Sequence, residues 1–265
     1  MPIKQITKKI LKTIHRPAKE SRKGDNGRLL IIAGSKKYHG AFYLCAAMAS
    51  KMVDFVYVYT TLENFSLIKN LRSKLAEFIY IDQKDLLATI EEAECILIGP
   101  GLMPDKKTGQ LVNNLLKKYP QKKMVLDAGA LRVVKPELLN KNCVITPHHQ
   151  EFSSMFNRPF SLAQALAISK TCPAVIVIKG SIDYVIQNGQ AYSNSTGNAG
   201  MTKGGTGDVL AGLLSALCAK SDPFLAARQA IYINGLAGDK LKEKFGLFYS
   251  ASELIIQAQI ILSKI

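Results

Sequence analysis

The chain has 265 residues, of which 48% are hydrophobic and 21% are charged, as in an ordinary globular protein. Its net charge of +15 comes from scattered lysines and arginines without interleaved aromatic residues, which argues against a nucleic-acid-binding module and favours a solvated, lysine-rich surface. No apolar run reaches the roughly 18 residues of a membrane helix, and the five cysteines lie far apart, so we expect a cytoplasmic protein with buried thiols that binds no membrane.

Residues 3–14 open the chain with apolar side chains at helical spacing and lysines on the opposite side. This pattern predicts an amphipathic packing helix, followed by a polar linker, over residues 1–22. An organellar presequence is the alternative, but such segments favour arginine and serine over lysine.

Short runs rich in Val, Ile and Leu then alternate with helical stretches. We expect strands at 28–33, 54–60, 77–81, 94–98, 124–126, 142–146 and 174–178, and helices at 41–52, 62–73, 207–219, 222–243 and 250–263. The pair Asn188-Gly189 predicts a hairpin between 184–187 and 190–193. The alternation predicts one α/β domain over residues 1–265, with a central, mostly parallel sheet and helices on both faces.

A glycine-rich turn meets a buried helix between residues 195 and 217. Gly205, Thr206 and Gly207 lead into Asp208, and the run that follows is apolar and uncharged. A helix start of this kind offers free amides to an anion, and a carboxylate beside them suits phosphoryl transfer. The alternative is a glycine turn that only caps a core helix, and the segment is not a Walker A loop.

Further candidate residues follow the predicted strands, because ligands of parallel α/β sheets gather beyond the carboxyl ends of the strands. Ala41 ends the loop after the first strand, Gly101 belongs to a Gly-Pro-Gly turn, and His148 comes directly after a buried strand. Residues 179–183 form a loop with a lysine and a glycine. Asp127 is a candidate for organising a metal-bound phosphate or for capping the next helix. Plain turns are the structural alternative at each place.

Three polar features are assigned no chemistry of their own. His148 and His149 stand near Glu151, but the spacing lacks the helical pattern of a zinc motif, so we expect no zinc site. Asp54 and Asp239 are isolated acids, and we expect both to be structural.

The sequence NAGMTKGGTGDVLAG at 198–212 resembles the signature of ADP/ATP-dependent NAD(P)H-hydrate dehydratases, a branch of the ribokinase-like fold. The loops that contain Ala41, Gly101 and His148 are similar to further motifs of that family. The resemblance implies transfer of a phosphoryl group from ADP, or ATP, to the ring hydroxyl of hydrated NADH or NADPH, followed by elimination of phosphate. It also implies Mg²⁺ and a homo-oligomer, and we expect no epimerase domain.

The resemblance gives each candidate residue an expected role. Asp208 is the expected catalytic base. The expected substrate contacts are Ala41, Gly101, His148 and Asp208; the expected nucleotide contacts are Lys179, Gly180, Ser181, Ile182, Asp183 and Gly207; and the expected anion hole is Gly205, Thr206 and Gly207. No metal ligand is assigned.

Five positions depart from the family pattern, and one of them is Asp183, which stands where a threonine is frequent. Met103 and Gly129 stand where the family has glycine and aspartate, and His149 and Gln150 stand where it has proline and glycine. The alternative function is a ribokinase-like kinase of a small molecule, such as a hydroxylated thiazole or pyrimidine. Such a kinase would use Asp208 and the glycine turn but release a stable phosphorylated product.

Overall fold

The computed structural model of the chain describes residues 3–61, 64 and 74–265, so the helix predicted at 62–73 lies outside the described residues. The described residues form one sheet of ten strands. The strands are β1 (Lys4–Gln5), β2 (Arg28–Ile32), β3 (Phe55–Tyr59), β4 (Ile79–Tyr80), β5 (Cys95–Ile98), β6 (Lys123–Leu126), β7 (Cys143–Ile145), β8 (Val175–Ile178), β9 (Asp183–Gln187) and β10 (Gln190–Asn194).

The strand order is β1-β10-β9-β8-β7-β6-β5-β2-β3-β4. All neighbours from β4 to β8 are parallel, whereas β9 is antiparallel to β8 and to β10. The turn between β9 and β10 has positive φ at both Asn188 and Gly189, as the predicted hairpin requires. The mostly parallel sheet is therefore confirmed.

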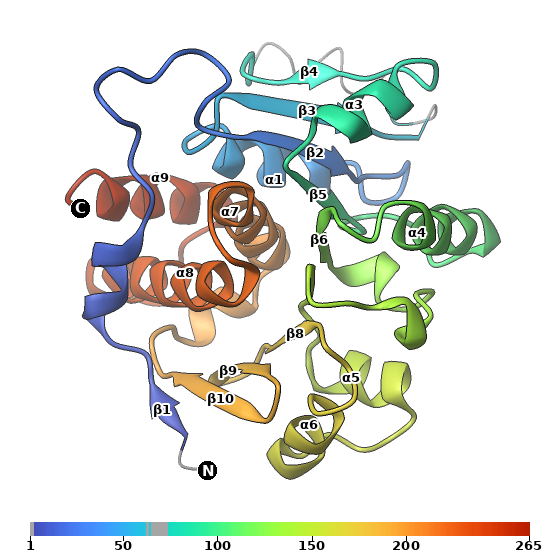
Figure 1. The fold of residues 1–265 in the computed structure, drawn as a ribbon. Helices are drawn as coiled ribbons and strands as arrows, with labels where there is room; N and C mark the ends of the chain where they lie inside the picture. The colour runs from blue at the N-terminus through green and yellow to red at the C-terminus, as the bar shows by residue number, and fades with distance from the viewer. Residues whose placement is uncertain (1–2, 62–63, 65–73) are drawn as a thin grey trace.

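Helices cover both faces of the sheet, as predicted (Figure 1). The apolar side chains of α1, α7, α8 and α9 join one core, and those of α3, α4, α5 and α6 join the other. The helices are α1 (Ala41–Ala49), α3 (Leu86–Glu92), α4 (Lys106–Lys118), α5 (His149–Phe156), α6 (Leu162–Ile168), α7 (Thr206–Lys220), α8 (Pro223–Phe245) and α9 (Ala251–Leu262), with short 3₁₀ helices at Lys8–Thr13, Ala128–Ala130, Pro136–Leu138 and Ala199–Thr202.

The direction of the chain through the sheet reverses between β2 and β5. From β2 the chain proceeds outward to β3 and β4, and it then returns to the other side of β2 to begin the run from β5 to β8. The loops after β2 and β5 diverge at such a point and leave a crevice at the carboxyl edge. The loops remain linked by a hydrogen bond of 2.8 Å from Gly34 N to Pro100 O.

The predicted amphipathic helix at 3–14 is wrong. These residues form β1, which pairs in parallel with β10, and then the 3₁₀ helix Lys8–Thr13. The edge of β10 offers unpaired backbone groups that an extended segment can satisfy, and that pairing outweighs helix formation here. The periodicity did identify packing residues, because Ile6, Leu11 and Ile14 are all buried in the core.

Helices α1 and α7 cross at a glycine. A Cβ atom at Gly212 would lie only 2.5 Å from the carbonyl oxygen of Cys45. Any side chain at this position would separate the two backbones. The contact therefore fixes the distance between the helix that begins at Ala41 and the helix that carries Asp208.

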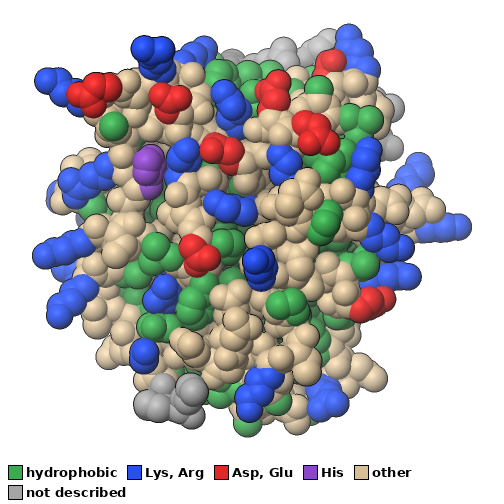
Figure 2. Space-filling view, viewed as in Figure 1, with side chains coloured by type: hydrophobic (Ala, Val, Ile, Leu, Met, Phe, Trp, Pro, Cys, Tyr) green, Lys and Arg blue, Asp and Glu red, His purple; other side chains and the backbone are tan. Residues whose placement is uncertain are grey.

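No helix formed by residues 3–61, 64 and 74–265 has both the length and the hydropathy that crossing a bilayer demands. On the face shown in Figure 2, Lys and Arg side chains are spread out, with acidic side chains among them. This distribution agrees with the scattered lysines of the sequence.

Candidate active site

The amino end of α7 carries free backbone amides, as the glycine turn predicts. Gly205 is the N-cap, with φ +94°, and provides no side chain to accept from the first turn. Thr206 N donates to Lys203 O at 3.3 Å, whereas the described residues supply no partner for the amides of Gly207 and Asp208. Twelve of the helix's residues are buried, which confirms that a core helix holds this turn.

The segment before α7 is anchored to α8 and to Tyr249. Asp239 accepts hydrogen bonds from Gly197 N at 3.0 Å and from Asn198 Nδ2 at 3.2 Å. Tyr249 donates to Asn198 Oδ1 at 2.8 Å and leaves room only for a glycine at position 200. Asp239 is therefore structural, as predicted, and it holds the glycine turn in place.

Asp208 is a half-buried carboxylate in the first turn of α7. Burial raises its pKa to about 7; the negative charge of Asp127 adds to the rise and the positive charge of Lys179 opposes it. The thiol of Cys45 donates to the Asp208 carbonyl oxygen at 3.2 Å and ties this turn to α1. A carboxylate with a pKa near neutrality can accept a proton and release it again at physiological pH.

A cavity of about 600 Å³ opens in front of this helix end. It brings together four of the predicted site residues, Ala41, Gly101, Gly205 and Asp208. The remaining lining residues include Lys37, Tyr38, Gly40, Leu44, Leu102, Met103, Pro104, Ala128, Gly129, Arg132, Glu151 and Gly204.

The wall formed by Ala41 and Gly101 is built from backbone in close contact. Gly101 has φ +69°, and a Cβ atom there would lie 2.7 Å from Tyr38 O and 2.8 Å from the Cβ of Ala41. Small residues are therefore required at both positions, and they leave the space beside them to the cavity.

Gly129 allows two loops to approach each other more closely than the family's aspartate would. A Cβ atom at Gly129 would lie 2.1 Å from the carbonyl oxygen of Leu102, so this loop conformation excludes any side chain there. Met103, the neighbouring departure, is 40% exposed and lines the cavity. The two departures thus meet in space, and the loop after β5 occupies the place of the missing acid.

Asp127 joins an ion pair at the ends of three adjacent strands. Its Oδ1 atom accepts from Lys179 Nζ at 2.8 Å and from Thr146 Oγ1 at 2.6 Å. It forms no side-chain cap on the following 3₁₀ helix, so that alternative is wrong. Burial alone would lower the pKa of Lys179, but the charge and hydrogen bond of Asp127, together with the charges of Glu151 and Asp208, raise it overall, so the ammonium group stays charged.

His148 begins α5 rather than lining the cavity. Its Nδ1 atom accepts from the amides of Gln150 and Glu151, and the Glu151 carboxylate accepts from His148 N in return, which completes a capping box. With Nδ1 accepting, the neutral ring carries its proton on Nε2. The second histidine, His149, stacks on Phe160 with ring centroids 4.1 Å apart.

Residues 179–183 form a turn that is closed by its own last residue. Asp183 accepts from Gly180 N at 3.1 Å and from Asn194 Nδ2 at 3.2 Å, and burial raises its pKa to about 6. Ser181 and Ile182 are exposed at the tip. These five predicted nucleotide contacts therefore form one turn after β8, and their role, like that of Gly207 on α7, stays a prediction.

Sequence reasoning missed several residues that line the cavity. Tyr38 and Arg132 stand close in sequence to predicted loops but carry no motif signal, and Glu151, which matches the family motif, was assigned no role. Thr206, which was predicted to help bind an anion, directs its hydroxyl to Met201 O at 2.5 Å and Lys203 O at 2.9 Å and so shapes the turn.

Comparisons with known proteins point to one family. A family model described as NAD(P)H-hydrate dehydratase matches residues 29–260. The chain is 36% identical over 257 residues to a bifunctional NAD(P)H-hydrate repair enzyme of Methanocaldococcus jannaschii, with 92% of this chain and 50% of that protein covered. It is 33% identical over 262 residues to an ADP-dependent (S)-NAD(P)H-hydrate dehydratase of Nitrosopumilus maritimus, with 92% and 91% covered. The chain thus spans about half the length of the bifunctional relative.

Solved structures agree with this assignment. A ribokinase-like protein of Enterococcus faecalis superposes with a TM-score of 0.90 at 25% identity, covering 99% of this chain and 96% of that one. An ADP/ATP-dependent NAD(P)H-hydrate dehydratase of Bacillus subtilis, co-crystallised with ATP and Mg²⁺, superposes with a TM-score of 0.85 at 26% identity, covering 100% and 99%. The ribokinase-like fold is therefore confirmed.

Proposed function

Since this chain belongs to the NAD(P)H-hydrate dehydratase family, we propose that it returns hydrated NADH and NADPH to their reduced forms, with ADP, or ATP, as phosphoryl donor. The observation that carries the proposal is the amino end of α7, where the Asp208 carboxylate stands beside free amides at a cavity. The cavity would take the hydrated nicotinamide ring, with Ala41 and Gly101 against it.

The reaction begins with the ring hydroxyl, which is a poor leaving group. Asp208 accepts its proton as the oxygen attacks the terminal phosphorus of the nucleotide, and the bond from that phosphorus to the nucleotide breaks. The C–O bond to the new phosphate then breaks, pushed by the lone pair of the ring nitrogen. Loss of a proton from the adjacent ring carbon restores the double bond of the dihydronicotinamide.

The backbone stabilises the charge that moves with the phosphoryl group. The free amide of Gly207 points out of the first turn of α7, where the partial positive charge of the helix dipole is concentrated. Residues 179–183 would hold the adenine nucleotide beside it. His148 would contact the substrate from outside the cavity wall, since its Nε2 atom lies 3.5 Å from Oε2 of Glu151, which lines the cavity.

Mg²⁺ fits this site only as a companion of the nucleotide. Among residues 3–61, 64 and 74–265, no group of three or more His, Cys, Asp or Glu side chains is placed to hold a metal ion. Mg²⁺ is commonly bound through phosphate oxygens and water, with few protein ligands, and it would supply charge neutralisation when bound. We assign no residue of this chain as its ligand.

A turnover assay tests the proposal. Purified protein is incubated with hydrated NADH, Mg²⁺ and either ADP or ATP, and the dihydronicotinamide absorbance and inorganic phosphate are followed. Recovery of the absorbance with equimolar phosphate supports the dehydratase. A phosphorylated alcohol that accumulates from a thiazole or pyrimidine, with no recovery of hydrated NADH, would instead establish the kinase.

The proposal also includes a cytoplasmic location and a homo-oligomeric state. All five cysteines are free and buried, which supports a reducing compartment such as the cytoplasm. A homo-oligomer is a prediction that sedimentation of the purified protein would test.

A further inference from the structure

We propose that Asp127 and Thr146 are positioning residues that hold the ammonium group of Lys179 at the carboxyl end of β8, where it neutralises the phosphoryl group during transfer. The inference rests on the proposed function and deepens it, because it assigns residues that neither touch the nucleotide nor line the cavity. Its basis is the ion pair of Asp127 with Lys179 and the hydrogen bond of Asp127 with Thr146, at the ends of three adjacent strands.

The three side chains come from successive strands of the parallel sheet. Asp127 follows β6, Thr146 follows β7 and Lys179 follows β8, so the sheet itself places them side by side at the carboxyl edge. One oxygen, Oδ1 of Asp127, accepts from both other side chains, at 2.8 Å and 2.6 Å. Asp127 and Thr146 are 3% and 1% exposed, so the carboxylate cannot turn away from the lysine.

Lys179 itself remains partly exposed. Its side chain is 23% exposed, against 4% for the side chain of Asp127. An ammonium group has three donors, and within the described part of the chain Asp127 takes the one hydrogen bond that Nζ makes. Two donors are thus left for phosphate oxygens, beside the turn at 179–183 that is predicted to hold the nucleotide.

A buried ion pair is a poor way to gain stability, because desolvation offsets much of the attraction. The burial of this pair is better explained by a role of Lys179 in binding phosphate than by a gain in stability. Lys179 interacts electrostatically with Asp208 and Glu151 as well as with Asp127, so it lies among the acids of the site. Asp127, without Lys179, would face Asp208 as an unpaired like charge.

The charged and titratable groups around Asp208 come from several elements. Asp127 and Lys179 act on it directly, and the Cys45 thiol of α1 contacts its carbonyl oxygen. The lining of the same cavity adds three more charged side chains, Lys37, Arg132 and Glu151. Removal of the Asp127 charge alone should move the acid limb of kcat/KM to lower pH.

The test compares four variants in the turnover assay. Asp127→Asn should lower kcat about 100-fold, with a smaller rise in KM for ADP, and should move the acid limb of kcat/KM down by about one pH unit. Thr146→Val keeps every charge and should lower kcat about fivefold without moving that limb. Lys179→Met should lower kcat at least as much as Asp127→Asn does. The double variant that carries both substitutions should have a kcat only slightly below that of Lys179→Met.

The control is a second lysine–carboxylate pair at the opposite edge of the sheet. Glu94→Gln breaks the 3.3 Å pair with Lys220 and should leave kcat and the pH profile unchanged. The proposal is overturned if folded Asp127→Asn retains the wild-type kcat and pH profile, or if the losses from Asp127→Asn and Lys179→Met simply multiply. If Asp127→Asn does not fold, an unchanged kcat in Thr146→Val overturns it.

The wild-type protein separates this failure from failure of the proposed function. If the wild type does not turn over hydrated NADH, the function is wrong, and ADP binding measured by calorimetry still tests the inference. Asp127→Asn and Lys179→Met should then weaken ADP binding to a similar extent, whereas unchanged binding in both would contradict the positioning role.

Discussion

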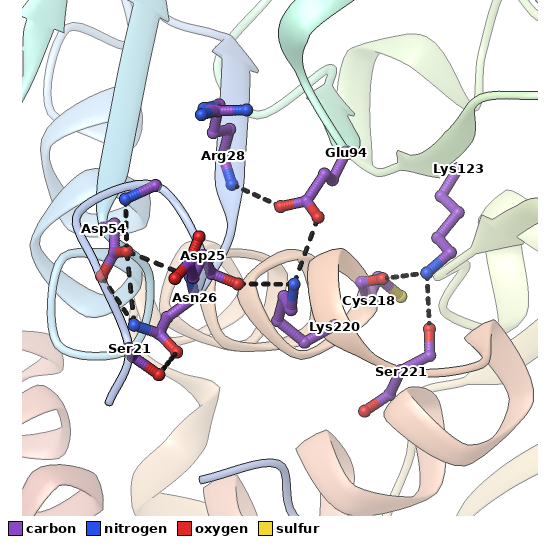
Figure 3. A network of polar contacts seen from close by, with 11 residues as sticks. Ser21, Asp25, Asn26, Arg28, Asp54, Glu94, Lys123, Cys218, Lys220 and Ser221 are labelled. Carbon is purple, nitrogen blue, oxygen red and sulfur yellow. Dashed lines mark hydrogen bonds and ion pairs between the residues drawn. The ribbon is translucent and has the colours of Figure 1, made fainter. Parts of the chain in front are cut away.

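At the amino ends of the strands of the central sheet, polar side chains form hydrogen bonds and ion pairs with one another and with nearby backbone groups (Figure 3). Lys123 donates to Cys218 O at 2.9 Å and to Ser221 O at 3.0 Å, so it satisfies carbonyls at the carboxyl end of α7. Lys220, in the last turn of that helix, pairs with Glu94. At the carboxyl edge the other end of the same helix has a glycine cap, free amides and a cavity.

Asp54 at the amino edge and Asp208 at the carboxyl edge differ in the same way. Burial alone would raise the pKa of Asp54, but hydrogen bonds from Asn26 and Gly24 and the charge of Lys220 outweigh it and lower the pKa. Burial raises the pKa of Asp208 to about 7, and the structure supplies no comparable set of donors among the described residues. One edge of the sheet satisfies its charges and gains stability, whereas the other leaves them available for chemistry.

Replacement of the site aspartate should have the largest effect on activity. Asp208→Asn removes the proton acceptor and should lower kcat about 1,000-fold in the turnover assay, with ADP binding retained in calorimetry. The matched control is Asp54→Asn, which should keep kcat but lower the melting temperature by about 2–4 °C for each kcal/mol lost with its hydrogen bonds. Equal kcat in the two variants would remove the distinction between the edges.

Asp208 and Asp54 should make the stability of the fold depend on pH in opposite directions. The folded protein binds more protons than the unfolded chain between pH 3.8 and about 7, because the pKa of Asp208 is raised across that window. Its contribution to stability therefore falls as pH rises through the window. Asp208→Asn should gain melting temperature relative to wild type from pH 4 to pH 8. Asp54, with a lowered pKa, stabilises the fold above its ordinary value and loses this contribution as pH falls.

The glycine cap of α7 should rank second. Gly205→Ala forces a side chain into φ +94° and puts its Cβ atom 2.5 Å from Leu44 Cδ1 and 3.0 Å from the Cβ of Ala251. The displaced amides should lower kcat about 10- to 100-fold. Gly204→Ala is the control, since its Cβ atom would meet nothing within 4 Å. Similar losses in both variants would show that the turn's flexibility, rather than its fixed geometry, matters.

The pH dependence of turnover should reveal the charge state of the base. In the proposed mechanism Asp208 works deprotonated, so kcat/KM should rise about tenfold for each pH unit below its pKa of about 7 and level off above it. Asp183, whose pKa is about 6, is the competing explanation. Asp183→Asn should therefore leave the position of the limb unchanged, and a limb that disappears in this variant would identify Asp183 as the titrating group.

The smallest effect should come from the amino edge. Lys123→Met removes two hydrogen bonds to carbonyls at the end of α7 and should cost about 1–2 kcal/mol, or roughly 2–8 °C in melting temperature. The kcat value should not change. Lys107→Met, which replaces an exposed lysine of α4, is the control and should leave the melting temperature within about 1 °C.

The regular parts of the fold were predictable because each depends on a local pattern. Runs of Val, Ile and Leu predict the buried strands β2, β5 and β8, and the residue types Asn188 and Gly189 predict the hairpin turn. The N-terminal segment was mispredicted because its partner, the edge of β10, lies almost 190 residues away in sequence, and periodicity cannot detect such pairing.

The site divides in the same way. The glycine turn and Asp208 were predictable because one contiguous stretch builds them. The pairing of Asp127 with Lys179 was not, because the two residues are 52 positions apart and follow strands that both flank β7. The capping role of His148 and the meeting of Gly129 with Leu102 likewise depend on side-chain and loop conformations that the motifs do not encode.

The crossing at Gly212 has a consequence for motion during the catalytic cycle. Two main chains that touch without side chains between them cannot slide apart by a change of rotamer, so α1 and α7 must move as one body. Ala41 and Asp208, which are proposed to contact the substrate ring and to accept its proton, should therefore keep a constant separation. A closing movement around the proposed substrate would therefore have to involve loops, such as those beyond β5 and β8, rather than a shift of α1 against α7.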